Sequence, residues 1–403
     1  MSHNTPDKSS AGAFKTVTPC LASAKALSLQ TVNNIPRRVW LEVSLQKLVE
    51  NYRKIAESVA PAQVLAVLKA NAYGLGVLPI ARALSDAGAA AFGVAEPHEA
   101  LQLLPLGKPV QILSSVLPEE VGPMVEAGVV LPVTDLATAR LISAAAVRCG
   151  KPAVVHIKLD TGMGRLGLLP AAAPAAIREA CRLPGLVCQG IFSHFPFAYE
   201  TGTDLTNRQM DLFCGILADL ARDDITFEKI HIANSDAINN FPRACRKPFN
   251  VVRTGINLHG SFDTVGKRAL KVTPVLTLKT RLTAVRDLPP GTGIGYGHTC
   301  RLAVKTRVGT VSAGYADGLP LALSNRGYLL IRGAPCPVLG RISMDYTTVS
   351  LEGVPDAAVG DEVVCLGGEG MYALTVEDWA ALKNTHPYEI ICSFGNRVER
   401  RYV

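Results

Sequence analysis

Short apolar runs alternate with amphipathic stretches from about residue 39 to residue 272 of the chain. Each run has the length of a buried strand. The predicted strands are Val64–Ala70, Ala91–Ala95, Val110–Ser114, Val129–Val133, Ala153–Asp160, Leu186–His194, Lys229–Asn234 and Asn250–Arg253. Between them, helix-like patterns cover Leu78–Gly88, Glu96–Leu104, Glu119–Ala127, Asp135–Arg148 and Thr206–Arg222, with Asp135 and Thr206 as predicted N-caps.

Eight strand–helix units of this kind indicate an α/β fold, a parallel (β/α)8 TIM-like barrel. An open doubly wound sheet is the alternative. Its dinucleotide-binding form has weak support, because the glycines are not arranged as GxGxxG.

The sequence pattern changes after residue 272, where short β-like runs are separated by the turn-forming residues Gly, Pro and Asp. These runs are Val275–Val285, Arg307–Ala313, Tyr328–Ile331, Ala334–Leu339, Thr347–Val349 and Glu362–Cys365. They predict a C-terminal all-β domain, and Val39–Val43 has the strand character to pair with it. The expected organisation is an N-terminal extension (residues 1–36), a strand segment (37–45), a barrel (46–272) and a β domain (273–403).

Composition and charge exclude several classes of protein. The first 38 residues hold five basic residues against one acid, so only +3 of the +7 formal charge remains for the rest, too little to suggest nucleic-acid binding. No apolar run approaches the roughly 18 residues that span a bilayer. The ten cysteines lack CxxC or CxxH spacing, which argues against a metal site and against a disulfide framework and favours a cytoplasmic protein. The basic, acid-poor leader reads as a flexible extension, with an organellar transit peptide as the alternative.

A single lysine ends the first barrel run. Val64–Leu68 is followed by Lys69 and then by the turn-forming Asn71-Ala-Tyr-Gly74. Lys69 therefore lies at the carboxyl end of a strand, where barrels place their chemistry. Partial burial lowers the pKa of such an amine, so that it can form a Schiff base with a carbonyl compound. The alternative is a lysine that only extends its amine to solvent from a buried stem.

A second lysine is expected inside the barrel. Alternation along Ala153–Asp160 puts His156, Lys158 and Asp160 on one face, and helices should cover the opposite, apolar face. A buried lysine is costly unless it is paired or neutralised. A plain ion pair between Lys158 and Asp160 is one solution.

The last strand ends carry residues suited to a phosphate. Ser235 offers a hydroxyl after the seventh strand, and Gly255 and Ile256 offer backbone amides after the eighth, where barrels often bind phosphate. Arg253 lies beside them and serves, in one reading, as a phosphate or carboxylate clamp. His194 ends the sixth strand, although a lone histidine is more often a satisfied core residue.

The stretch Val67-Leu-Lys-Ala-Asn-Ala-Tyr-Gly74 resembles the pyridoxal-phosphate lysine motif of alanine racemases, and the resemblance covers about residues 38–403. It implies pyridoxal 5'-phosphate as the cofactor of Lys69. The implied cofactor-binding residues are Lys69, Tyr73, Asn234, Ser235, Arg253, Gly255, Ile256 and Asn396. The resemblance also implies that Arg253 faces the pyridine nitrogen and that His194 packs by the cofactor, bonded to a catalytic tyrosine. Lys158 becomes a carbamylated lysine that holds Arg165, which meets the cofactor phenolic oxygen and the substrate carboxylate.

Two motifs of the β domain extend this resemblance. Gly293-Ile-Gly-Tyr-Gly-His298 makes Tyr296 the second catalytic base, nineteen residues before the gate tyrosine Tyr315 of Gly-Tyr-Ala-Asp-Gly. Met344 and Asp345 match a pair that binds substrate carboxylate and lines the entrance. In the family these residues reach the active site of a partner subunit, which implies a homodimer with shared sites.

The C-terminus departs from the family pattern. Many alanine racemases end in Ser-Tyr-Arg-Val-Pro-Arg, whereas this chain has Asn396 at the tyrosine position, a variant that resembles serine/alanine racemases. Thr254 replaces the usual Pro and Leu75 a frequent His. The expected activity is a two-base interconversion of L- and D-alanine, with serine also turned over, that supplies D-alanine for peptidoglycan. The alternatives are a racemase of broader specificity, a decarboxylase of the same fold, a cofactor-free Schiff-base aldolase and a non-catalytic cofactor carrier.

Overall fold

The computed structural model describes residues 35–263 and 265–403. Its first sheet has eight strands in the order β4-β3-β2-β9-β8-β7-β6-β5, and every pair is parallel. The strands are β2 (Gln63–Val67), β3 (Ala91–Val94), β4 (Val110–Ile112), β5 (Leu131–Val133), β6 (Ala153–Lys158), β7 (Leu186–Phe192), β8 (Lys229–His231) and β9 (Val251–Thr254). The Ile112 N–H donates to the Val130 carbonyl at 3.0 Å, which joins the two end strands into a barrel. The (β/α)8 barrel is therefore confirmed, and the open sheet is excluded.

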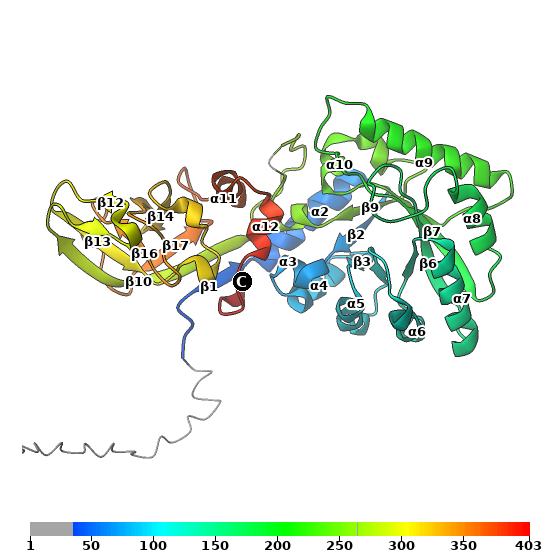
Figure 1. Ribbon diagram of the computed structural model, residues 1–403, viewed down its shortest axis with the longest axis horizontal. Helices are drawn as coiled ribbons and strands as arrows, with labels where there is room; N and C mark the ends of the chain where they lie inside the picture. The colour runs from blue at the N-terminus through cyan, green and yellow to red at the C-terminus, as the bar shows by residue number, and fades with distance from the viewer. Residues whose placement is uncertain (1–34, 264) are drawn as a thin grey trace, which may run out of the picture. The chain divides into compact units, whose positions relative to one another are not determined.

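Helices cover the outside of the barrel (Figure 1). They are α2 (Leu45–Val59), α4 (Val77–Asp86), α5 (Pro97–Leu103), α6 (Pro118–Ala127), α7 (Leu136–Cys149), α8 (Ala173–Ala180), α9 (Leu205–Ala221) and the short α10 (Ser235–Asn240). The Asp135 carboxylate accepts the Thr138 N–H at 2.7 Å, which confirms this N-cap. The Thr206 N-cap is wrong, because Asp204 holds that position. Thr206 is buried two residues later, and its hydroxyl donates to the Phe197 carbonyl.

The C-terminal domain is built around one long strand, with which shorter and mostly antiparallel strands pair. Its strands are β1 (Trp40–Val43), β10 (Leu276–Leu288), β13 (Thr306–Val311), β14 (Tyr328–Ile331), β15 (Ala334–Pro337), β16 (Thr347–Ser350), β17 (Glu362–Leu366) and β18 (Glu399–Tyr402), with the small pair β11 (Gly293–Ile294) and β12 (Cys300–Arg301). β1 pairs antiparallel with β10 and parallel with β18, so the strand expected ahead of the barrel lies in this sheet. Two helices that the strand pattern did not predict, α11 (Val376–Lys383) and α12 (Pro387–Cys392), precede the last strand.

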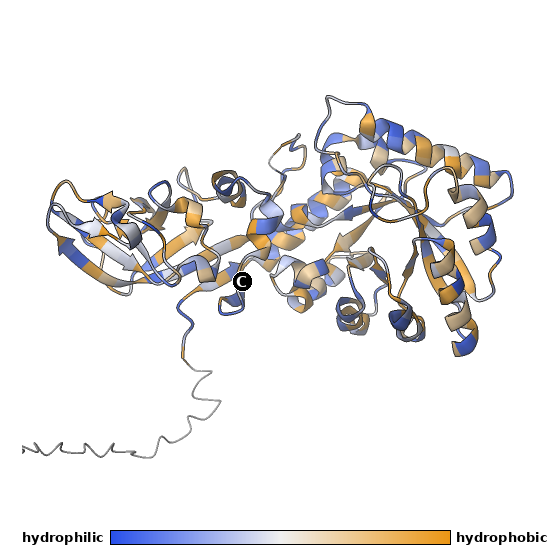
Figure 2. Ribbon diagram, viewed as in Figure 1, coloured by the Kyte–Doolittle hydropathy of each residue, from blue (hydrophilic) through white to orange (hydrophobic). Residues whose placement is uncertain are grey.

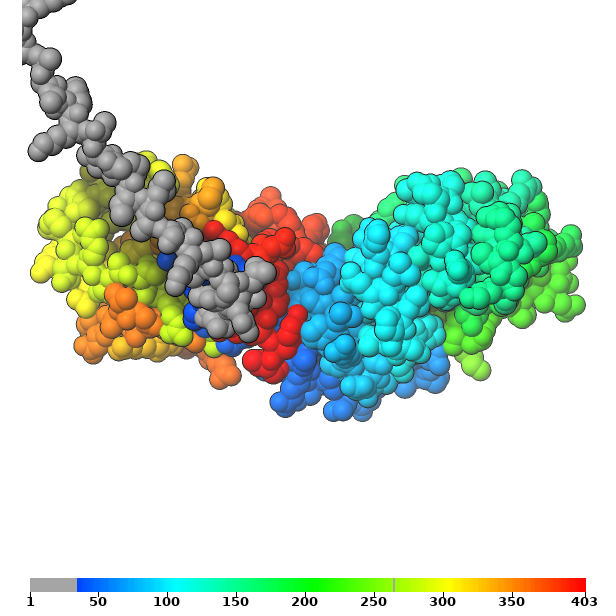
Figure 3. All heavy atoms as spheres, turned by 90° about the horizontal axis from the view of Figure 1, so that it is seen from below, coloured from blue at the N-terminus to red at the C-terminus, as the bar shows by residue number. Residues whose placement is uncertain are grey.

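The C-terminal strand also contacts the first loop of the barrel. Arg400 Nε donates to the Gly74 carbonyl at 3.0 Å, and the Tyr402 hydroxyl donates to the Leu75 carbonyl at 2.9 Å. In Figure 3 the red C-terminal residues lie directly against blue residues from the start of the barrel. Residues Arg38–Val403 accordingly form one compact unit.

Hydrophobic residues are concentrated along the strands and on the inner faces of the helices, and hydrophilic residues on the outer faces of the helices (Figure 2). Among residues 35–263 and 265–403, no helix has both the length and the apolar character to cross a membrane. Residues 1–34 of the predicted N-terminal extension lie outside the described residues, so that expectation stays a prediction.

Candidate active site

Lys69 follows β2 and opens α3 (Lys69–Tyr73), which is a left-handed turn. Ala70, Asn71, Ala72 and Tyr73 all have φ between 52° and 61°. This conformation costs an L-residue roughly 1–2 kcal/mol. Small side chains and an asparagine tolerate it best, which explains the Ala-Asn-Ala sequence. The turn moves the chain away from the strand direction directly after Lys69.

Polar contacts hold this strained turn. The Glu99 carboxylate accepts the N–H groups of both Ala70 and Ala95, the latter at 2.8 Å. The Asn71 side-chain oxygen accepts the Val77 N–H at 2.8 Å. These bonds, with those from Arg400 and Tyr402 described above, offset the backbone cost. Glu99 was not predicted from the sequence, because it acts on a turn 29 residues away.

A cluster of four basic side chains lies at the mouth and interior of the barrel: Lys69, Lys158, Arg165 and Arg253. Burial, followed by the positive charge of Arg165, lowers the pKa of Lys69. Burial, followed by Arg253 and Arg165, lowers the pKa of Lys158 to about 7. Groups of like charge disfavour each other's protonation, so both amines are shifted toward the neutral, nucleophilic form. The site therefore attracts anions.

Asp160 does not pair with Lys158. Its carboxylate accepts the N–H groups of residues 162–165 at 2.7–3.0 Å, and Lys158 Nζ instead donates to the Leu113 carbonyl at 2.6 Å. No ion pair joins the two among the described side chains. The plain Lys158–Asp160 ion pair is therefore wrong, because the backbone of the following loop occupies the carboxylate.

Arg253 lies buried within the barrel on β9. Its Nη2 donates to the Ser193 carbonyl at 2.7 Å and to the Ile232 carbonyl at 3.1 Å, and lies 3.2 Å from His194 Nδ1. An arginine only donates, so His194 accepts through Nδ1 and carries its proton on Nε2. Burial lowers the pKa of Arg253 to about 9, and the guanidinium remains charged at neutral pH.

A chain of hydrogen bonds continues from Arg253 toward the opposite end of the barrel. Arg253 Nη1 donates to His231 Nδ1 at 2.8 Å, and His231 Nε2 lies 3.0 Å from His156 Nδ1. His156 Nε2 then lies 3.5 Å from the Gln189 oxygen, whose amide donates to Glu228 at 3.0 Å. Because Arg253 can only donate, His231 accepts at Nδ1 and carries its proton on Nε2, and His156 in turn accepts at Nδ1 and carries its proton on Nε2. The sequence analysis placed His156 in the barrel but missed its partners, His231 on β8 and Gln189 on β7.

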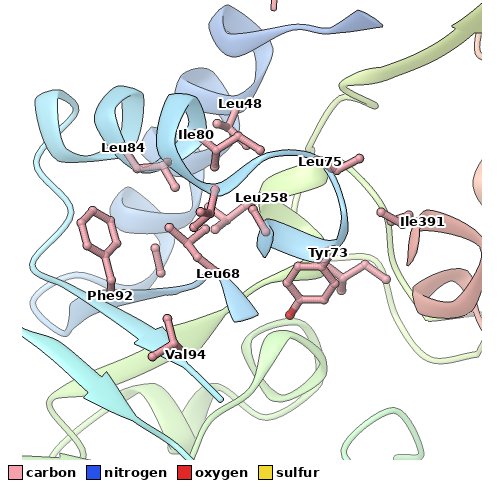
Figure 4. Close-up of a cluster of buried hydrophobic side chains, with 14 of the residues drawn as sticks. Leu48, Leu68, Tyr73, Leu75, Ile80, Leu84, Phe92, Val94, Leu258 and Ile391 are labelled. Carbon is pink, nitrogen blue, oxygen red and sulfur yellow. The ribbon is translucent and has the colours of Figure 1, made fainter. Parts of the chain in front are cut away.

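The residues expected to bind the cofactor phosphate lie in contact with one another. Tyr73 is fully buried, and a Cβ at Gly255 would lie 1.9 Å from its hydroxyl, so only glycine fits there. Ser235 accepts the Gly255 N–H at 3.2 Å and lies 3.4 Å from the Thr254 hydroxyl. Figure 4 shows the Tyr73 ring packed near Leu75 and Ile391 with its hydroxyl directed away from them. Hydroxyls, backbone amides and the cationic cluster fit a phosphorylated carbonyl cofactor bound to Lys69.

Asn234, which the sequence motifs assign to the cofactor site, is the N-cap of α10. Its side-chain oxygen accepts the Ala237 N–H at 3.0 Å and caps α10. This bond occupies the amide oxygen and places Ser235 at the start of the helix. Asn396 is exposed on the C-terminal segment.

The remaining predicted residues form a second group on the β domain. Tyr296, Tyr315 and Met344 are exposed by 70%, 46% and 52%, unusual values for large side chains. The Tyr315 N–H donates to the Ser343 carbonyl at 3.1 Å, which fixes the tyrosine beside Met344 and Asp345. Large exposed side chains of this kind are typical of surfaces that bind another molecule.

The closed barrel, the reactive amine after its first strand and the anion-binding cluster define a Schiff-base enzyme that holds a phosphorylated cofactor. The family model described as alanine racemase, N-terminal domain, matches residues 43–262, and that of the C-terminal domain matches residues 275–402. The chain belongs to the alanine racemase family, as the sequence motifs predicted.

Named relatives agree with this assignment. The chain is 38% identical to the alanine racemase of Desulforamulus reducens over 91% of this chain and 99% of that protein. It is 36% identical to that of Halothermothrix orenii over 91% and 97%. Among solved structures it resembles the alanine racemase of Clostridium difficile 630, with a TM-score of 0.84 and 31% identity over 92% of this chain and 96% of that one. It also resembles the Bartonella henselae alanine racemase with covalently bound pyridoxal phosphate, with a TM-score of 0.82 and 30% identity over 91% and 100%.

Proposed function

We propose that this chain is a pyridoxal-phosphate-dependent racemase that interconverts L- and D-alanine with two bases, Lys69 and Tyr296. The observation that carries the proposal is the Lys69 amine, held by a strained turn beside Arg165, Lys158 and Arg253 with a lowered pKa. Family membership supports the same reaction. The D-alanine produced would supply peptidoglycan synthesis in the cytoplasm.

Different barrel residues would bind the cofactor and transfer the proton. Bound pyridoxal phosphate acidifies the α-hydrogen of the amino acid by withdrawing electrons from Cα. Lys69 takes or returns that proton on one face of Cα. Tyr73, Ser235 and the amides of Gly255 and Ile256 hold the phosphate.

Arg253 favours racemisation over transamination. It would face the pyridine nitrogen of the cofactor. Because its guanidinium stays protonated at neutral pH, it cannot accept a proton from that nitrogen and disfavours protonating it. With the cofactor bound, this would favour return of the proton to Cα over its transfer to the cofactor. Its bonds to Ser193, Ile232 and His231 hold the guanidinium in one place.

Lys158 would carry a carbamate. Its pKa of about 7 leaves much of the amine neutral at physiological pH, and a neutral amine adds CO2 with release of one proton. The resulting anion would compensate the positive charges of Arg165, Arg253 and Lys69, because the Asp160 carboxylate is bonded to backbone N–H groups instead. Arg165 would then be held toward the substrate carboxylate.

The second base comes from another copy of the chain. Tyr296, Tyr315 and Met344 are exposed on the β domain, and a second copy placed head to tail would cover them and bring Tyr296 to the opposite face of Cα. Each active site then combines one barrel with the partner's β domain. His194, whose Nδ1 faces Arg253, keeps its Nε2–H for the incoming tyrosine.

A chiral assay tests the proposal. Purified protein with pyridoxal phosphate is given L-alanine, L-serine, L-lysine or L-arginine, and both enantiomers are measured by chiral chromatography. We expect D-alanine from the native chain and a loss of at least about a thousandfold in kcat for Lys69→Ala and Tyr296→Phe. The exposed Lys54→Ala and Tyr372→Phe are matched controls and should keep full activity. Release of CO2 without D-alanine would identify a decarboxylase, and full activity of either base variant would overturn the mechanism.

A further inference from the structure

Three backbone segments meet on the β domain around the exposed group. We call them the entrance turn (residues 314–318, with Tyr315), the entrance loop (residues 341–345, with Met344) and the C-terminal turn (residues 393–397). The entrance turn and entrance loop lie in close contact, because a Cβ at Gly314 would lie 2.3 Å from the carbonyl oxygens of Ser343 and Met344. The Ala316 N–H also donates to the Met344 carbonyl at 3.1 Å.

Arg397 joins all three segments. Its Nε and Nη2 donate to the two carboxylate oxygens of Asp317 at 2.7 and 2.8 Å, a bidentate pair. Its Nη1 donates to Asp345 at 2.7 Å, and Nη2 lies 3.4 Å from the Met344 carbonyl. The Asp317 side chain is only 3% exposed, and it also accepts the Gly314 N–H at 3.0 Å. One guanidinium thus links the entrance turn, the entrance loop and the segment that carries Asn396.

We propose that Arg397 is a positioning residue for substrate entry, which holds Tyr315 and Met344 in the arrangement that admits and binds the amino-acid carboxylate. This inference rests on the proposed function, because it takes Tyr315, Met344 and Asp345 as the entrance. Arg397 donates to Asp317, to Asp345 and to the Met344 carbonyl. Through these bonds it would act on the reaction by holding the entrance residues in place.

The geometry of the contact requires an arginine. A planar guanidinium can bind Asp317 with two parallel bonds and still reach Asp345, whereas a lysine ammonium is a point charge that satisfies one of them well. Loosening the link frees the entrance turn and the entrance loop relative to each other. The affinity for substrate should then fall, while proton transfer at Lys69 and Tyr296, which lie outside these segments, continues.

Steady-state kinetics of Arg397→Lys and Arg397→Ala test the inference. We expect the KM for L-alanine to rise about tenfold or more, with kcat within about threefold of the native value, the split expected when substrate binding alone is lost. Guanidinium ion added to Arg397→Ala should restore part of the KM. Arg401→Lys is the matched control, because Arg401 pairs with Glu399 on the same C-terminal strand, away from the entrance. A KM for Arg397→Lys within twofold of native, with unchanged cofactor absorbance, would overturn the inference.

Two further variants separate positioning from general destabilisation. Gly314→Ala perturbs the same contact without touching any charge, and it should raise KM in the same way. Asp345→Asn weakens one arm of the link, and its effect on KM should not add to that of Arg397→Lys, because residues of one network are coupled. Full additivity of the two substitutions would contradict the proposed link.

Mixed dimers place the effect in one of the two sites. In a dimer of a Lys69→Ala chain and a Tyr296→Phe chain, the intact site combines the barrel of the second chain with the entrance of the first. Adding Arg397→Lys to the Lys69→Ala chain should raise KM, and adding it to the Tyr296→Phe chain should not. The opposite result would overturn the inference. A mixed dimer without any activity would instead count against the shared site, and the single-variant KM values would still decide the role of Arg397.

Discussion

Lys158 shows how a buried residue acquires its chemistry from its neighbours. In an exposed position its amine would be a cation at every physiological pH. Inside the barrel, burial and the charges of Arg253 and Arg165 bring its pKa to about 7, while the carboxylate of Asp160 is engaged by backbone N–H groups. An unpaired buried cation is costly, so conversion to an anion is favoured.

The pH dependence of the carbamate follows from this shift. Because the folded-state pKa is lowered from the ordinary value to about 7, the amine is neutral above that pH and protonated below it. Protein equilibrated with 13C-bicarbonate should show a carbamate carbon signal by NMR at about pH 8 that fades at about pH 6, where the protonated amine cannot add CO2. Lys158→Gln should lack the signal. Its absence from the native chain at the higher pH would contradict the prediction.

Asn396 is the residue on which substrate preference is predicted to depend. An amide in place of a phenol removes an aromatic wall and adds hydrogen-bonding capacity, and both changes favour a hydroxymethyl side chain. L-serine should be turned over at a rate comparable with L-alanine. A preference for alanine beyond about a thousandfold in kcat/KM, roughly 4 kcal/mol, would reject this.

Replacing the residue provides the reciprocal test. Asn396→Tyr should lower the ratio of kcat/KM for serine to that for alanine by about tenfold, the scale of one lost pocket contact. Both rates are measured on the same preparations of native and variant protein. A ratio within twofold of the native value would show that Asn396 does not set the preference.

At the scale of an element, the left-handed α3 turn is a strained piece that the surrounding contacts stabilise. Four consecutive non-glycine residues hold positive φ directly after Lys69. Such strain persists only where the surroundings determine it, and it clusters at functional sites. Here hydrogen bonds from the turn and its flanking residues to Glu99, Arg400 and Tyr402 hold the strained conformation.

A matched pair of glycine substitutions measures this strain. Ala70 is exposed in the left-handed turn, and Ala144 is exposed in the right-handed helix α7. Ala144→Gly should lower the free energy of unfolding by about 0.5–1 kcal/mol. Ala70→Gly should leave it unchanged or raise it by up to about 1 kcal/mol, because relief of strain opposes the greater entropy of the unfolded chain. Urea unfolding at one protein concentration compares them, and equal losses would argue against strain at residue 70.

At the scale of the whole molecule, the two proposed catalytic bases belong to different parts of the chain. Lys69 follows the first barrel strand, and Tyr296 is 70% exposed on the β domain. The sheet of the β domain includes β1, which precedes the barrel in the sequence, and the last strand, β18, pairs with β1. Both parts therefore belong to one compact unit, which in the proposed dimer would present its barrel mouth and entrance group to a second copy.

Mixing inactive variants tests the shared active site. Dimers of Lys69→Ala and of Tyr296→Phe are each expected to be inactive, but after subunit exchange half the dimers are mixed and one of their two sites is intact. Activity should then recover to about one quarter of the native level. Exchange between two Lys69→Ala preparations is the control. If the mixture stays inactive although mixed dimers are detected by mass spectrometry, both bases act within one chain.

The periodic pattern of apolar residues was sufficient to predict all eight barrel strands, five of the barrel helices and seven strands of the C-terminal sheet, because such signals depend on neighbours along the chain. It missed helices α2, α8, α10, α11 and α12 and the short strands β11, β12 and β18. The position of Lys69 at a strand end and the family motifs could be read in the same way. The left-handed turn, the missing Lys158–Asp160 pair and the Arg253–His231–His156 chain could not, because each depends on partners from other segments. Arg397 is the clearest case: its carboxylate partner Asp317 lies 80 residues earlier, and only folding brings the two together. Local sequence thus determined which elements form, and tertiary packing decided which charges meet.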